Sequence, residues 1–223
     1  MTYGLAEQNY AFGAGIARKT GRLIPKDLPS HGNRVWRVTT GPAIEPIISD
    51  DVKDFSGIDY TDHDTLLDNF IAAVRGAAEE YMGKSFIERT IQMKMDYWPG
   101  TIIELPSPPL ISVTKIVTLD EDDAETEYDS DNYYIITQGF PGKVVLKKSV
   151  TSPQNTTRDY GGFMIEFKAG YGVNATDVPE GIRNGLKIWV ASVYATRKLD
   201  PKNPPPEARS SLDLYRDGSV MIR

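Results

Sequence analysis

Residues 101–119 read TIIELPSPPLISVTKIVTL, and this stretch decides the fold. Two apolar segments stand on either side of a proline cluster at 106–109. The spacing Pro106-x-x-Pro109 is that of a polyproline ligand, but such ligands usually lie in disordered, exposed segments. Proline disfavours the helical region for the preceding residue and lacks a donor for a strand ladder, so it suits a crossover between strands. We therefore predict two strands joined by a stiff proline connection.

Further strands are expected around this pair, because short apolar segments recur between turn signals. Ile91, Met93 and Met95 alternate with polar residues, which is the pattern of a half-buried strand. The other expected strands are 133–137, 143–147 and 163–168. The acidic run at 120–131 departs from the spacing of a calcium-binding EF-hand loop, so we interpret it as a solvated turn. The pattern predicts a β insertion over about 86–170, an antiparallel sheet or small barrel-like domain.

Helical periodicity flanks the insertion on both sides. Leu67, Ile71 and Val74 belong to one wide apolar stripe, and Gly83 follows it as a helix C-cap. The expected helices are 49–55, 64–82 and 179–198. The last of them contains Gly181-x-x-x-Gly185, which indicates close helix packing. The order of elements predicts an α+β fold, a helical bundle core with an inserted antiparallel sheet.

Both ends of the chain differ in composition from the expected core at 44–200. Residues 1–43 are rich in glycine and hold six basic and two acidic residues, a net charge of +4. Because the whole chain has a net charge of −6, the remaining residues have a net charge of −10. Such a segment is typical of a flexible arm that becomes ordered on a partner. An acidic body argues against wrapping duplex DNA, because that affinity comes chiefly from Lys and Arg.

The C-terminal 201–223 segment is rich in proline and contains a small apolar cluster. Its prolines prevent the last helix from continuing and favour an extended, semi-rigid spacer. The apolar residues beyond the spacer either fold back on the body or bury themselves on a neighbouring molecule. The residues expected at this partner interface are Leu212, Leu214, Tyr215, Arg216, Val220, Met221 and Ile222.

No catalytic, metal or cofactor motif emerges from the sequence. The chain has no cysteine, and its two histidines, His31 and His63, lie in separate segments without a second ligand at metal-binding spacing. Phosphate-binding loops are missing, and we expect no cofactor. No signal peptide or membrane span is expected either. Two alternatives stay open: a hydrolase that uses a pair of carboxylates, and a single-strand nucleic-acid binder that uses the basic arm and some of the 22 aromatic residues.

A set of short motifs points to a family. The motifs are EPI at 45–47, IAAVR at 71–75, AEEYMGK at 78–84, DYWP at 96–99, ELPSPPLISV at 104–113, AGYG at 169–172, VPEGIR at 178–183 and YATR at 194–197. Their order and spacing resemble those of the head-tail connector, or adaptor, proteins of tailed bacteriophages and gene transfer agents, over roughly residues 44–200.

The resemblance implies a structural protein of the virion neck, at the head-tail interface, made in the cytoplasm of a bacterial host. Connectors of this family form a ring of copies, usually twelve, below the portal protein after DNA packaging. The expected partners are the other copies, the portal protein, and a stopper, tail-completion or tail protein. Packaged double-stranded DNA would pass through the channel without sequence-specific binding. The chain departs from the family in its long N-terminal arm and in seven residues that follow LDLYR at 212–216.

Overall fold

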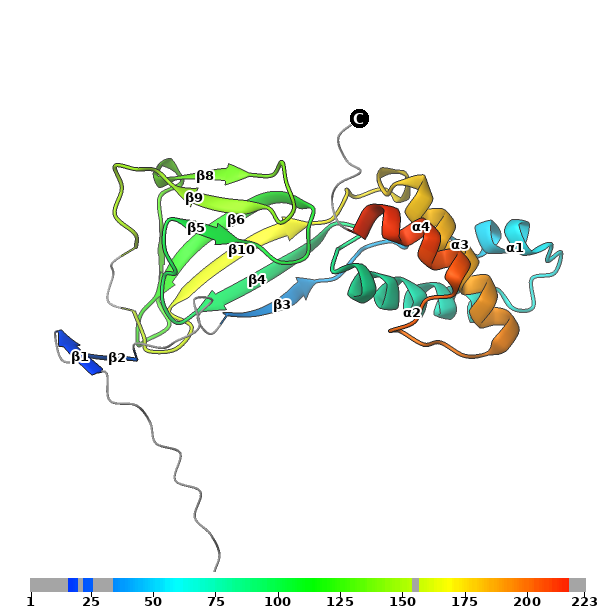
Figure 1. Ribbon diagram of the computed structural model, residues 1–223, viewed down its shortest axis with the longest axis horizontal. Coiled ribbons are helices and arrows are strands. Elements are labelled where there is room, and N and C mark those ends of the chain that lie inside the picture. Colours follow the sequence, from blue (N-terminus) through cyan, green and yellow to red (C-terminus); the bar gives the residue numbers. More distant parts are fainter. Residues whose placement is uncertain (1–15, 20–21, 26–33, 154–156, 217–223) are drawn as a thin grey trace, which may run out of the picture.

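The computed structural model describes residues 16–19, 22–25, 34–153 and 157–216. Strands gather on one side and helices on the other (Figure 1). The helices are α1 (Ser49–Ser56), α2 (Asp64–Met82), α3 (Glu180–Thr196) and α4 (Pro206–Arg216), with 3-10 turns η1 (Ser130–Asn132) and η2 (Ala175–Asp177). The predicted α+β class is confirmed. Among the described residues, no helix has the length and apolar character needed to cross a membrane.

The strands form antiparallel sheets of five and three strands and a separate two-stranded hairpin. The five-stranded sheet has the order β3-β4-β10-β6-β7, and the three-stranded sheet has the order β5-β9-β8. The strands are β1 (Ile16–Lys19), β2 (Arg22–Pro25), β3 (Arg34–Thr40), β4 (Arg89–Met95), β5 (Ile102–Glu104), β6 (Leu110–Leu119), β7 (Glu125–Glu127), β8 (Tyr133–Ile136), β9 (Lys143–Leu146) and β10 (Phe163–Ala169). The proline cluster at 106–109 connects β5 to β6, as predicted.

One apolar core lies between the two larger sheets and another among the helices. Met93 and Ile165 from the large sheet and Ile103 and Val144 from the small sheet share the first core. Met93, Ile103 and Val144 alternate along their strands with more exposed neighbours, because successive side chains of a strand point to opposite faces. The other face of the large sheet holds a small buried cluster of Val117, Leu119 and Met164.

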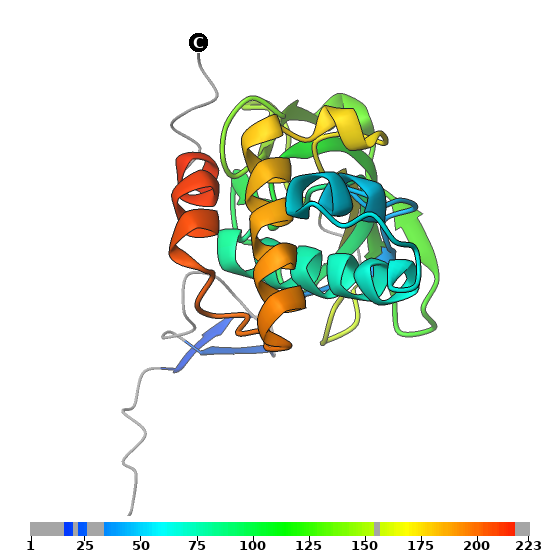
Figure 2. The same ribbon diagram turned by 90° about the vertical axis from the view of Figure 1, so that its right-hand side faces the viewer.

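The helical core is built on the apolar stripe of α2. Leu67 and Val74 on α2 pack in one cluster with Leu186 and Trp189 of α3. In Figure 2, α4 lies alongside α3, and α2 crosses the direction of α3. α2 spans the expected range and ends at Gly83, whose φ of +65° is the left-handed conformation that favours glycine. α1 begins at Ser49, as expected, and its N-cap is the extended residue Ile48.

A buried carboxylate joins the helical side to the sheet. Glu79, on the last turns of α2, is 7% exposed and accepts hydrogen bonds from Arg75 Nη1 at 2.8 Å and from the Phe86 backbone N–H at 2.9 Å. Arg89, the first residue of β4, also pairs with Glu79. Arg75 in turn binds Glu45 at 2.6 Å. The network ties the start of the core, α2 and β4 into one unit.

The ends of the chain differ from the expectations. Residues 34–40, expected within the N-terminal arm, form β3 at the edge of the large sheet. This strand was missed because most of its side chains are exposed, so it shows no alternation of buried and exposed residues. The expected proline spacer of the tail is instead followed at once by α4, which begins at Pro206. The first turn of a helix tolerates proline, since its N–H groups have no intrahelical partner.

Candidate assembly surfaces

The helix α4 carries four of the residues expected to contact a partner, and it packs on the body. Ala208 and Leu212 are fully buried. They lie over Gly185 of α3, where an added Cβ would stand 3.0 Å from Leu212 Cδ2 and 3.4 Å from the Ala208 carbonyl oxygen. The motif Gly181-x-x-x-Gly185 thus permits the close packing of α4. Leu212, which was expected at the partner interface, packs on α3 and provides the apolar contact that holds this short helix on the body.

The end of α4 is also held by polar contacts. The Tyr215 ring covers Gly181, and its backbone carbonyl accepts a hydrogen bond from the buried Lys84. The guanidinium of Arg216 lies 4.8 Å from the Tyr81 ring centroid. Burial and the hydrogen bond that Tyr81 donates to Asp213 at 2.7 Å raise the pKa of the Tyr81 phenol. Tyr215 and Arg216 therefore have partners within the chain.

Among the described residues of the tail, Leu214 is an exposed apolar side chain that a partner could contact. It is 58% exposed on the outer side of α4, opposite Leu212. Val220, Met221 and Ile222 lie outside the described residues.

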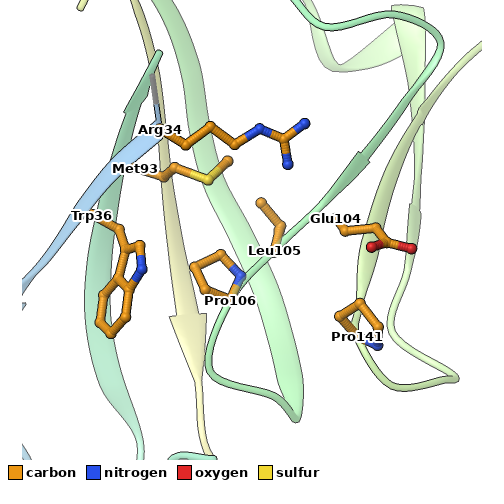
Figure 3. Close-up of a pocket in the computed structure, with 7 residues that line it drawn as sticks. All are labelled: Arg34, Trp36, Met93, Glu104, Leu105, Pro106 and Pro141. Carbon is orange, nitrogen blue, oxygen red and sulfur yellow. The ribbon is translucent and has the colours of Figure 1, made fainter. Parts of the chain in front are cut away.

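The edge strand β3 presents apolar side chains that sequence reasoning assigned to the arm. Val35 is 62% exposed and Trp36 is 49% exposed. Trp36 and Arg34 line one side of a groove of about 290 Å³, and Pro106 and Pro141 line the other (Figure 3). The run RVWRVTT at 34–40, rich in β-branched and aromatic residues, was the available signal for a strand.

The outer face of the small sheet is a second exposed apolar surface. Ile102, Val145 and Tyr134 stand opposite one another on the three strands, and Ile102 and Tyr134 are exposed. Lys147 covers part of this surface, with its Nζ 5.1 Å from the Tyr134 ring centroid.

Polar side chains cross the outer face of the large sheet in a row. Arg37 donates to Gln92 Oε1 at 3.3 Å, and Gln92 donates to Glu166 Oε2 at 2.8 Å. Lys115 follows Glu166 in the register and binds Glu125. The hydrogen bond to Glu125 raises the pKa of the Lys115 ammonium. The row carries a positive charge at the β3 edge and a negative charge near the β7 edge.

His63 occupies a structural position. Its Nδ1 lies 2.6 Å from the Tyr194 hydroxyl, which is also 2.9 Å from the Tyr60 hydroxyl. These contacts join the start of α2 to the last turns of α3. Among the described residues, no group of three or more His, Asp or Glu side chains could hold a metal ion. His31 lies outside the described residues.

Comparison with known proteins shows two kinds of similarity. Residues 50–133 match the family model described as phage gp6-like head-tail connector protein. No curated protein sequence matches the chain. The matched segment runs from α1 through α2 and β4 to the start of β8.

Three solved structures share the fold over most of the chain. A chain in the neck of a native gene transfer agent (GTA) particle, computed with C12 symmetry, is 18% identical with a TM-score of 0.68. The neck of an empty GTA particle, computed with C6 symmetry, gives 17% and 0.69, and the virion of the native particle gives 18% and 0.69. Each match covers 82% of this chain and 95% of the other. The connector model over residues 50–133 and the shared fold of these GTA chains thus confirm the resemblance to the head-tail connectors of phages and gene transfer agents.

Proposed function

We propose that the protein is a structural head-tail connector of a virion neck. The observation that carries this proposal is the connector family match at 50–133, which lies inside a fold shared with chains of the GTA neck. The matched segment holds Glu79 with its partners Arg75 and Arg89, and the first strands of the insertion. It is therefore the part of the chain that joins the helices to the sheets.

The connector works as a ring of identical subunits. The similar neck structures were computed with C12 and C6 symmetry, which favours a ring of twelve copies in the particle. A head-to-tail contact between copies closes into a ring when its rotation allows. The acidic character of the chain beyond residue 43 suits a channel through which packaged double-stranded DNA slides, because few phosphates are neutralised.

The proposed partners on the two sides of the ring are the portal protein and a stopper or tail protein. We assign the portal contact to Leu214 and to the segment that follows α4, including Val220, Met221 and Ile222. Leu214 supports this assignment because it is an exposed apolar residue on a helix whose other apolar residues face the body. The basic residues before position 34 are a further candidate for partner contact.

A non-enzymatic role agrees with these observations better than either alternative. The family is described as a head-tail connector, and the similar chains belong to particles. His63, one of the two histidines, is engaged with Tyr194. We expect His63→Ala to leave assembly intact wherever the protein stays folded, as judged by particle yield.

Deleting the gene in the producing phage or GTA tests the proposed function. Without the connector, we expect DNA-filled heads that lack tails, as seen by electron microscopy. Supplying the full chain in trans should restore tailed particles, and mass spectrometry should find it there at a fixed low copy number. Tailed, infectious particles without the protein would overturn the proposal.

A further inference from the structure

The two edges of the large sheet carry opposite charges. The β3 edge holds Arg34 and Arg37. The β7 edge holds Glu125 and Glu127, and the turn before it adds acidic residues at 120–123. Three strands, β4, β10 and β6, separate these edges. One subunit therefore presents complementary charges at opposite ends of the same sheet.

The strand register places Arg37, Glu125 and Glu127 on one face, whereas Arg34 lies on the other face with Trp36. Val35 pairs with Lys94, Lys94 with Met164, Met164 with Val117, and Val117 with Glu127. Side chains that stand opposite in a sheet, and those two residues away on the same strand, point to the same face. Arg37 and Glu125 consequently lie on the face that bears Val35 and Glu127.

A charged side chain on each edge strand of the large sheet has no ion-pair partner among the described residues. Among the described residues, Arg37 makes no ion pair and donates only to the neutral Gln92, while Glu127 is exposed and makes no ion pair. The interior of the polar row, by contrast, is paired, with Gln92 bound to Glu166 and Lys115 to Glu125.

The β3 edge also has the character of a contact surface. Among the described residues no strand pairs with its outer side, and Val35, Trp36 and Val38 are exposed. A seven-residue edge strand with exposed apolar side chains invites pairing with another chain, and soluble proteins usually cover or charge such an edge. The charges here are basic, so the occupant should be acidic.

We propose that the β3 edge of one subunit docks on the β7 edge of the next subunit, with Arg37 facing Glu127. This inference rests on the proposed connector function, because it supplies the lateral contact of the ring. The contact is heterologous, which is the kind that repeats around a ring. It continues the polar row from one subunit into its neighbour and removes Val35 and Trp36 from water.

Charge reversal in the full chain tests the contact. Arg37→Glu alone would set like charges against each other at every contact in the ring, and so would Glu127→Arg alone. Because like charges across an interface are strongly unfavourable, we expect each variant to lower the yield of tailed particles by at least about tenfold. Lys148→Glu, an exposed position outside both edges, makes the same charge change and should leave the yield unchanged.

Mixing the two defective variants gives the decisive measurement. In a ring that alternates Arg37→Glu and Glu127→Arg subunits, every contact again pairs a basic with an acidic side chain, and an even ring accommodates the alternation. We expect co-expression to restore tailed particles to within about threefold of the wild type, since opposite charges are again paired. The double variant in a single chain should behave in the same way.

Two results would overturn the inference while leaving the proposed function intact. Normal yield from both single variants would show that the edges do not meet. Defective single variants that stay folded, by unchanged melting temperature, but that fail to rescue each other would show that the charges act elsewhere. Absence of the wild-type protein from tailed particles would instead reject the connector function itself.

Discussion

At the scale of single residues, Glu79 has the largest expected effect on stability. It is buried and binds two arginines and a backbone N–H. Glu79→Ala leaves the mostly buried Arg89 without its carboxylate partner and leaves Arg75 with Glu45 alone. Breaking such a pair typically costs about 3–5 kcal/mol, which we expect as the loss in free energy of unfolding by chemical denaturation.

Glu80→Ala is the matched control for this prediction. Glu80 is the next residue on α2 and is exposed, so its removal should change the free energy of unfolding by less than about 0.5 kcal/mol. Equal effects of the two substitutions would mean that the Glu79 network does not stabilise the junction.

We expect the folded protein to lose stability at high pH because of Tyr171. Burial raises the pKa of its phenol to about 12, and its hydroxyl has no hydrogen-bond partner among the described residues. The unfolded chain ionises this group near its ordinary pKa of 10, whereas the folded chain keeps it neutral. Its contribution to stability is therefore complete below pH 10 and is lost as the pH rises from 10 to about 12.

The substitution Tyr171→Phe isolates this effect. It removes the ionisation and a hydroxyl without a partner, so the variant should match the wild type near neutral pH and lose less melting temperature between pH 10 and 11. Thermal unfolding followed by circular dichroism provides the measurement. Parallel curves for the two proteins over that range would contradict the assignment.

At the scale of elements, α4, which packs on α3, can be tested separately from residues 217–223, which follow it. Deleting 206–223 uncovers Gly185 and removes the buried Leu212, and burying one Leu is worth about 1.5–3 kcal/mol. We therefore expect a clear fall in melting temperature. Deleting only 217–223 should leave the melting temperature unchanged while lowering attachment to DNA-filled heads. An unchanged melting temperature after the longer deletion would show that α4 does not pack on α3.

Elements marked by an apolar period or an apolar run, including the short β8 and β9, could be predicted from the sequence, and elements without such a mark could not. The stripe on α2 and the alternation along β4 are set by burial over many residues. The strand β7 has three residues, all exposed, so no pattern marks it. The helix α4 buries only Ala208 and Leu212, and the prolines before it indicated a spacer.

The candidate interface, too, could be predicted only in part from the sequence. Sequence reasoning selected the apolar residues of the tail, but the sequence alone does not tell which side of a short helix meets its own body. Leu212 and Leu214 are two residues apart and lie on opposite sides of α4, one buried and one exposed. The exposed β3 edge was missed because pairing with β4, far along the chain, defines the strand.

At the scale of the whole molecule, charge separates a connector from a nucleic-acid binder. Residues 1–33 hold four basic and two acidic residues, a net charge of +2. Because the whole chain has a net charge of −6, residues 34–223 have a net charge of −8. Binding to single strands needs aromatic side chains within a basic groove. The exposed Trp36 lies beside Arg34, but the groove they share also holds Glu104.

The chain lacking residues 1–33 should therefore bind neither duplex nor single-stranded DNA. Fluorescence anisotropy with labelled oligonucleotides at about 50 mM salt gives the most favourable conditions, because affinity for DNA falls steeply as salt displaces phosphate contacts. The full chain should bind weakly, if at all, and should lose that binding near 200 mM salt, as expected for a few Lys and Arg contacts. Substituting Arg18 and Arg22 by Glu in the full chain should reproduce the truncation, which assigns any binding to charge before β3. Tight binding of single strands by the truncated protein would place a nucleic-acid site on the acidic body, and a connector whose channel lets DNA slide would then be the wrong description.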